Sequence, residues 1–307
     1  MDRTIKDYAI ISLKGALMGA ADVVPGVSGG TIAFISGIYE ELLVTISNFN
    51  LSLLKLYRKQ GFKAAWHQSN ASFLVSLFLG IAISVISLAK GISFLLLNYP
   101  TLVWGFFFGL VVASIFYIGK QVEYWRVQEI VALLLSGVIA YIVTIAEPMI
   151  GNHVSLFFFF LAGVLAICAM ILPGISGAFI LVLLGAYEPV LTAIHTKDLF
   201  VISIVGSGCI VGLLMFSRVL KWMFSNYKNR TLVVLTGFVV GSLNKIWPWK
   251  QTISTRINSK GIEVPVLQKS ILPTDCCANT EFITVVFLVV FGFFLIFGLE
   301  KLASDKS

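Results

Sequence analysis

Two copies of one short motif carry the residues best suited to binding an anion. The first copy reads VPGVSGG from Val24, and the second reads LPGISGA from Leu172. Proline stops a helix, glycine permits a sharp reversal of the chain, and serine caps the helix that follows. A helix beginning there directs unpaired N–H groups and the positive end of its dipole toward the break. We therefore expect each motif to break a helix and to bind an anion there.

The candidate anion ligands are residues of these motifs and two lysines in apolar segments. They are Gly26, Ser28, Gly29, Gly30, Gly174, Ser176, Gly177, Lys14 and Lys245. A charge inside a membrane costs about 2.5–3.5 kcal/mol on insertion scales unless it is paired or hydrated, so each lysine is expected to neutralise the anion. For Lys245, close to the end of its segment, extension toward the membrane interface is an equally good interpretation. For the motifs, the alternative is that they only kink helices for packing.

Three carboxylates near the motifs are candidates for proton coupling: Asp22, Glu40 and Glu188. The pairs Tyr39-Glu40 and Tyr187-Glu188 have a simpler alternative interpretation, an aromatic anchor at the interface followed by a solvated carboxylate. Ten helical residues from Thr31 to Glu40 rise about 15 Å, half the thickness of the hydrocarbon layer. A continuous helix that starts at the midplane would therefore bring the first pair to the interface.

The chain lacks the patterns of an enzyme. It has no triad, metal-ligand or nucleotide-binding motif, and its four cysteines have no metal-ligand spacing. We expect no catalytic residue, no metal and no cofactor. The excess of 22 Lys and Arg over 15 Asp and Glu is typical of the cytoplasmic loops of a membrane protein, so nucleic acid is not an expected partner.

The composition predicts a membrane protein built from helices. Of 307 residues, 58% are apolar and 12% are charged, half of the ~25% typical of soluble domains. The mean hydropathy is +0.95. Apolar runs of this length exclude a disordered chain, a secreted disulfide-rich domain and an ordinary soluble enzyme.

An internal repeat organises the chain. At a fixed offset of 148 residues, ten of the 23 positions from Val24 and from Leu172 are identical, including the Gly-x-Tyr-Glu that follows each motif. Shared lipid-like composition produces chance leucine and isoleucine matches, but it does not produce two such motifs in register. The chain therefore contains a duplication.

Charge predicts how the copies lie. The loop 48–70 holds Lys55, Arg58, Lys59 and Lys63 and is expected to be cytoplasmic, as is the N-terminal tail. The segment between them must then enter and leave on one face as a re-entrant hairpin. Three crossings follow before the second copy, so the repeats have inverted topology, which is typical of secondary transporters. Both termini are predicted to be cytoplasmic, although the basic residues of the predicted outer loop 248–281 fit this scheme poorly.

The expected fold is an all-α polytopic membrane protein with two inverted repeats, each with a broken-helix hairpin. Repeat 1 is 1–147, with hairpin 8–47 and transmembrane helices 71–97, 101–119 and 130–147. Repeat 2 is 148–307, with hairpin 154–194 and transmembrane helices 199–223, 231–247 and 282–299.

Three runs resemble the PopT-type polyprenyl-phosphate transporter family, formerly a domain of unknown function. They are MGAADVVPGVSGGTIAFISGIYE at 18–40, ILPGISGAFILVLLGAYEPVL at 171–191 and GSLNKIWPWK at 241–250. The resemblance implies translocation of undecaprenyl phosphate, the lipid carrier of peptidoglycan synthesis, from the outer to the inner leaflet of the bacterial cytoplasmic membrane. The chain departs from the family pattern at Asn244 and Glu41, where basic residues are common.

The expected mechanism is alternating access, with the lipid head group held between loops 25–30 and 173–178. Two other functions stay open from the residues: transport of a small soluble anion, and a membrane assembly factor that transports nothing. The sequence is compatible with a homo-oligomer, and it leaves open the coupling ion and the roles of loop 248–281, Cys276 and Cys277.

Overall fold

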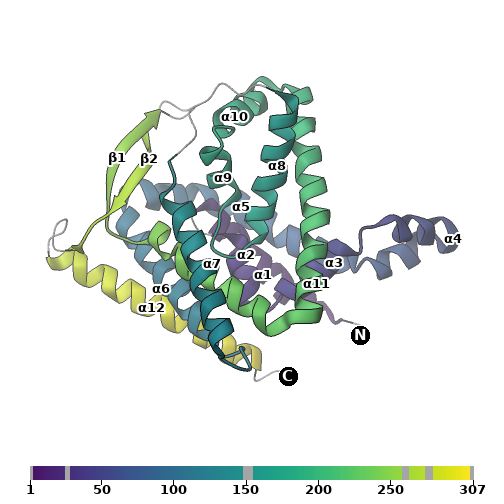
Figure 1. Ribbon diagram of the computed structural model, residues 1–307, viewed down its shortest axis with the longest axis horizontal. Helices are drawn as coiled ribbons and strands as arrows, with labels where there is room; N and C mark the ends of the chain where they lie inside the picture. Colours follow the sequence, from purple (N-terminus) through teal and green to yellow (C-terminus); the bar gives the residue numbers. More distant parts are fainter. Residues whose placement is uncertain (1–2, 25–27, 148–154, 258–262, 274–278, 305–307) are drawn as a thin grey trace.

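The computed structural model describes residues 3–24, 28–147, 155–257, 263–273 and 279–304 (Figure 1). Gly26, Cys276 and Cys277 lie outside these residues. The elements in chain order are α1 (Ile5–Val23), α2 (Gly29–Ile35), α3 (Tyr39–Ser47), α4 (Leu51–Gln68), α5 (Ala71–Asn98), α6 (Pro100–Gly119), α7 (Val127–Ile145), α8 (Leu156–Ile171), α9 (Gly177–Leu183), α10 (Tyr187–Thr196), α11 (Leu199–Ile246), β1 (Lys250–Ile257), β2 (Glu263–Ser270) and α12 (Asn279–Ser304).

Long apolar helices form the framework of the molecule. Among the described residues, α5, α6, α7 and α11 are long and apolar enough to cross a membrane, and the number of spans rises from four to six if each bent helix pair counts as one. A helix lies at each of the six predicted crossings. The crossings expected at 199–223 and 231–247 are joined in α11, where only Tyr227 leaves helical geometry (φ −140°, ψ 47°). The predicted basic turn between them is therefore the kink at Tyr227, where two helices meet.

Each hairpin contains a bent pair of short helices. The axes of α2 and α3 differ by 114°, and those of α9 and α10 by 109°. Gly37 and Gly185 both have φ +72°, a backbone conformation that residues with a side chain rarely adopt. Each of these glycines ends the preceding helix. At Gly37 the end bonds run from the Gly37 N–H to the Phe34 carbonyl and from the Ile38 N–H to the Ala33 carbonyl, the Schellman pattern.

The bend makes the expected continuous helix from Thr31 to Glu40 wrong, because Gly37 ends α2 before Tyr39 begins α3. The prediction of a helical membrane protein with two broken-helix hairpins is confirmed by the same geometry. In both repeats the glycine of Gly-x-Tyr-Glu makes the turn, and the tyrosine opens the next helix.

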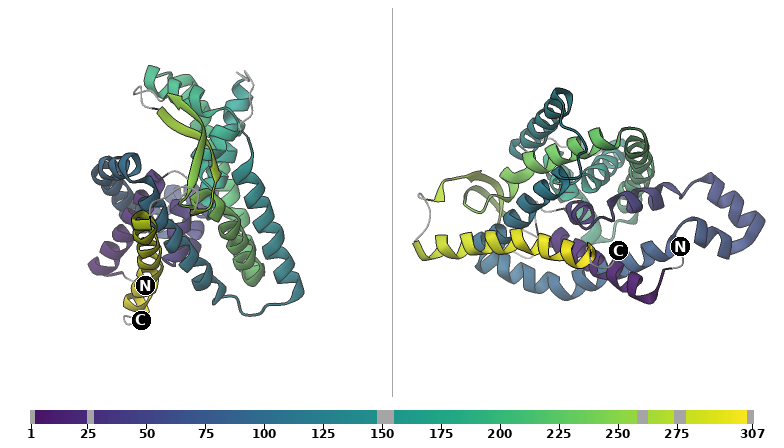
Figure 2. Two further views of the ribbon diagram at one scale, coloured as in Figure 1. Left: turned by 90° about the vertical axis from the view of Figure 1, so that its left-hand side faces the viewer. Right: turned by 90° about the horizontal axis from the view of Figure 1, so that it is seen from below.

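Helix packing links the two halves of the chain. α1 packs against α5, and α8 packs in the same way against the first part of α11. The last predicted crossing of each repeat packs against a helix of the other repeat. α7 of repeat 1 lies against α11, and α12 of repeat 2 lies against α6 (Figure 2). The halves are therefore intertwined rather than side by side.

Two segments that are expected to be loops contain regular secondary structure. The predicted loop 48–70 contains α4, which is kinked at Gly61 (φ +82°) and projects from the rest of the molecule (Figure 1). Within 248–281, β1 and β2 form an antiparallel hairpin. Its base is fixed to the end of α11 because Trp247 Nε1 donates to the Ile271 carbonyl (2.9 Å) and the Ile271 N–H donates to the Trp249 carbonyl (3.0 Å).

Candidate functional site

The two breaks meet in the structure. Ser28 Oγ donates to the Met170 carbonyl at the end of α8 (3.2 Å). In the other direction, the Gly174 N–H donates to Thr31 Oγ1 in α2 (2.8 Å). Two motifs that lie 148 residues apart in the sequence thus form one joint.

The first break is closed by the protein's own groups. Asp22 Oδ1 accepts from the Gly29 N–H (2.7 Å), and Ser28 Oγ accepts from the Gly30 N–H (3.1 Å). All seven residues of α2 are buried, and Ser28 is 2% exposed. The Asp22 carboxylate therefore takes the position that an anionic ligand would take at this helix N-terminus.

Gly30 is required for this closure. A Cβ at Gly30 would lie 2.7 Å from the Ile171 carbonyl oxygen and 2.8 Å from that of Met170, closer than real Cβ atoms approach. The carbonyl end of α8 thus abuts the N–H end of α2, an arrangement in which the two helix dipoles attract.

The second break has a different lining. Ser176 is the N-cap residue of α9 but makes no capping hydrogen bond with its side chain. It lines a small cavity with Thr144, Gly174 and Lys245. The Lys245 ammonium lies 4.0 Å from the centre of the Phe179 ring. Four of the predicted ligands therefore belong to this break, since Gly177 opens α9 directly after Ser176.

Lys14 lies away from both motifs. Its ammonium donates to the Ser36 carbonyl (2.7 Å), at the opposite end of α2 from Gly29. A cation at this position stabilises the C-terminal end of the helix. The structure thus gives Lys14 a structural partner within its own hairpin.

Of the three candidate coupling groups, only Asp22 lies at a break. Glu40 pairs with Lys228 (Oε1 to Nζ 3.1 Å) beside the kink of α11. Glu188 is exposed in the first turn of α10.

The interpretation of Tyr39 as an interfacial anchor is wrong. Tyr39 is 2% exposed, and its hydroxyl donates to the Ile171 carbonyl (3.1 Å). Its ring contacts Phe34 and Phe224 edge to face. Tyr39 therefore adds a third link between the first hairpin and the end of α8.

Lys250 is a partly buried cation that is not among the predicted ligands. Its ammonium donates to the Lys245 carbonyl and lies 3.9 Å from the centre of the Trp104 ring. Lys250 is the first residue of β1, outside the membrane-spanning helices. Burial, and then the charge of Lys245, lower the pKa of Lys250 from its ordinary 10.5 to about 7.

Asn244 fixes the β-hairpin beside the second break. It donates through Nδ2 to Thr144 Oγ1 (3.4 Å) and accepts through Oδ1 from Ser270 Oγ (2.8 Å). The run GSLNKIWPWK was the available signal for this region, because it places two lysines and two tryptophans at the end of one helix.

Comparison with known proteins gives consistent results. A family model described as undecaprenyl phosphate translocase-like matches residues 18–264. A polyprenyl-phosphate transporter of Vibrio cholerae is 44% identical over 304 residues, which cover 97% of this chain and 98% of the relative. A polyprenyl-phosphate transporter of Staphylococcus aureus is 29% identical over 253 residues, which cover 77% and 85%. No solved structure matches the chain.

Proposed function

The chain belongs to the undecaprenyl phosphate translocase-like family, and from this premise we propose that it transports polyprenyl phosphate across a bacterial cytoplasmic membrane. It is a multi-pass membrane protein of a transporter family rather than an enzyme. The finer proposal is that undecaprenyl phosphate moves from the outer to the inner leaflet, where it is reused as the carrier of peptidoglycan precursors.

The observation that carries the proposed site is the position of Lys245 beside Ser176 at the second break. A lipid phosphate needs a cation and hydrogen-bond donors in a place otherwise surrounded by apolar groups. Lys245 supplies the charge, and the Ser176 hydroxyl and the backbone of the second motif supply donors. The Asp22 carboxylate makes the first break unsuitable for a second phosphate, so we assign a single head group to the joint.

Alternating access would act on the bonds that join the hairpins. The bonds Ser28–Met170, Thr31–Gly174 and Tyr39–Ile171 all connect one repeat to the other. Rocking of one hairpin against the other would break this set and expose the head group first to one face and then to the other, while the prenyl chain stays in lipid. Both termini are placed on the cytoplasmic side in this scheme.

Proton coupling is a further part of the proposal. Asp22 is the carboxylate at the joint, and its protonation would remove the acceptor charge at the Gly29 N–H. Glu40 would act through its ion pair with Lys228. Glu188 would act from the equivalent position in the second hairpin.

Leaflet exchange in proteoliposomes tests the transport proposal. The measured quantity is the fraction of labelled undecaprenyl phosphate that an impermeant phosphatase reaches over time. The wild-type protein should move labelled lipid from the inner leaflet of the vesicle to the outer leaflet, where the phosphatase reaches it. Lys245→Gln and Ser176→Ala should slow this movement. Lys269→Gln, which removes an exposed cation of nearby β2, is the matched control and should behave like the wild type.

Two outcomes would contradict the proposal. Uptake of inorganic phosphate without lipid exchange would identify a transporter of a small soluble anion. A folded wild-type protein that moves neither substrate would favour the assembly factor.

A further inference from the structure

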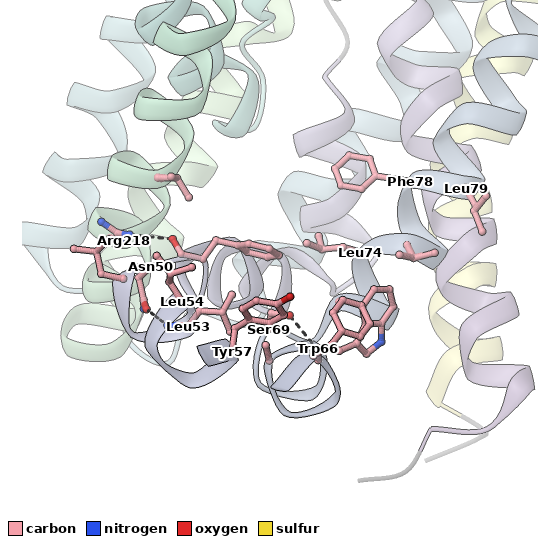
Figure 3. A pocket seen from close by; sticks show the side chains of 17 residues that line it. Asn50, Leu53, Leu54, Tyr57, Trp66, Ser69, Leu74, Phe78, Leu79 and Arg218 are labelled. Atoms are coloured by element: carbon pink, nitrogen blue, oxygen red, sulfur yellow. Dashed lines mark hydrogen bonds between the residues drawn. The ribbon is translucent and has the colours of Figure 1, made fainter. Parts of the chain in front are cut away.

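A wide groove of about 1170 Å³ lies on the side of the molecule that carries α4. In Figure 3, Arg218 of α11 lies on one side and Phe78 and Leu79 of α5 lie on the other, with Leu54 and Tyr57 of α4 below them. The groove therefore opens between α5 and the first part of α11, with α4 as its floor. It is separate from the small cavity at the second break, with which it shares no lining residue.

The lining is apolar and rich in aromatic side chains. Five rings contribute to it: Phe49, Tyr57, Phe62, Trp66 and Phe78. Phe62, Phe78 and Leu79 remain 55–65% exposed, so the described residues leave a large apolar surface uncovered. An apolar surface of this kind is compatible with the prenyl chain of a lipid. The flat rings suit the planar double bonds of an isoprenoid chain.

Among the described residues that line the groove, one has a charged side chain. Arg218 donates through its guanidinium to the Phe49 carbonyl (3.1 Å), which fixes the side chain at the junction of α11 and α4. The guanidinium group has five N–H donors in a planar fork, the geometry that matches a phosphate. Apolar walls with an arginine at one side are complementary to a lipid that ends in a phosphate.

The side chains of α4 carry positive charge, as Arg218 does. The helix carries Lys55, Arg58, Lys59 and Lys63 and no acidic residue, and none of these four cations lines the groove. Its apolar face thus forms the floor of the groove, while its basic face is available to the membrane surface. The basic face raises the local concentration of anionic lipids near α4.

We propose that this groove binds polyprenyl phosphate on the α4 side of the membrane, with the prenyl chain along the aromatic floor and the phosphate at Arg218. This inference rests on the proposed function and extends it, because it assigns a second position to the same lipid. The lipid occupies the groove when its head group is away from the second break. The groove also distinguishes the two possible substrates, because a lipid would bind in an apolar groove and a small soluble anion would not.

The test fills the groove without touching the second break. Val75→Trp places an indole in the groove from α5, and Leu79→Trp provides a second variant, since both positions are exposed. Ile83→Trp, exposed on α5 outside the lining, is the matched control. Binding of undecaprenyl phosphate and of short-chain farnesyl phosphate is measured in phosphatidylcholine nanodiscs. Both groove variants should bind the long lipid about tenfold more weakly and the short one unchanged, a loss of about 1.4 kcal/mol.

The phosphate position is tested by Arg218→Gln, with Lys221→Gln as the control one turn along α11. Arg218→Gln should weaken binding of the long lipid, and Lys221→Gln should not.

If the wild type binds and exchanges the lipid while both groove variants bind it equally well, the groove proposal is wrong and the proposed function stands. If the wild type binds neither lipid, the proposed function itself fails. Equal displacement by excess phosphatidylglycerol and by unlabelled undecaprenyl phosphate would make the groove a general acidic-phospholipid site and overturn the proposal.

Discussion

The first and second breaks share a motif but differ at the positions that surround it. At the repeat offset of 148, Asp22 corresponds to Met170, and Gly30 corresponds to Ala178. Asp22 satisfies an N–H group at the start of α2, whereas Met170 contributes only its carbonyl, to Ser28. The first copy is therefore the closed side of the joint.

The second copy lacks this closure. Thr31 accepts from the Gly174 N–H, but its counterpart Phe179 places an aromatic ring under the Lys245 ammonium. A duplicated motif thus supplies the break in both repeats. A few neighbouring residues decide which break stabilises the joint and which one is the phosphate site that we propose.

The largest expected effect separates the two lysines near the breaks. Lys245→Gln removes the cation of the second break and should weaken binding of polyprenyl phosphate about tenfold or more, because hydrogen bonds to charged groups contribute about 1.5–3 kcal/mol. Lys14→Gln should lower the thermal stability of the protein and leave affinity nearly unchanged, because Lys14 binds the Ser36 carbonyl. Titration of both variants in nanodiscs measures the difference, and equal losses of affinity would contradict the assignment.

The next effect tests the closure of the first break. Gly30→Ala inserts a methyl group against the Met170 and Ile171 carbonyls and should destabilise the protein by about 1–3 kcal/mol. The reciprocal change at the equivalent position, Ala178→Gly, affects an exposed residue and should change stability much less. Thermal unfolding in detergent compares the two variants. A neutral Gly30→Ala would mean that the breaks do not abut as described.

A smaller effect distinguishes the two serines. Ser28→Ala leaves the buried Gly30 N–H without its acceptor and should cost about 1 kcal/mol, the usual value of an N-cap. Ser176 caps nothing with its side chain, so Ser176→Ala should change stability by less than about 0.5 kcal/mol while lowering affinity. Stability and affinity are measured on the same preparations. A stability loss confined to Ser176→Ala would reverse the roles of the breaks.

The last effect is a pH dependence at Lys250. Its folded pKa of about 7 lies below the ordinary 10.5, so between these values the unfolded chain binds a proton that the folded chain does not. Stability should therefore rise as the pH increases above 7, and Lys250→Met should flatten this rise. Melting temperatures from pH 6 to pH 9 measure it, and an equal slope in both proteins would exclude Lys250 as the cause.

Much of the fold follows from the sequence because the repeat is strong and the apolar runs are long. The motifs around Ser28 and Ser176 predict the breaks, and the inverted arrangement expected from the charges predicts that they meet. The bend at Gly37 was missed, although its signal, the repeated Gly-x-Tyr-Glu, was visible, because glycine within an apolar run does not by itself reveal a positive φ. α4 is not predicted because its charges indicate a cytoplasmic segment without indicating that this segment is helical.

The site was harder to predict than the breaks. Lys14 and Lys245 are equally plausible cations in the sequence, and only tertiary contacts show that one binds the far end of α2 and the other lies beside Ser176. The packing of α7 on α11 and of α12 on α6 also depends on long-range contacts that no local pattern encodes.

The most direct test of phosphate binding at the second break is whether the lipid protects a single cysteine there from a thiol reagent. In a background without the four native cysteines, Ser176→Cys and Ser28→Cys are each labelled with a methanethiosulfonate reagent, with and without undecaprenyl phosphate. The lipid should protect the cysteine at position 176 and leave the slow labelling at position 28 unchanged. Protection at position 28 with none at position 176 would contradict the assignment of the second break as the phosphate site.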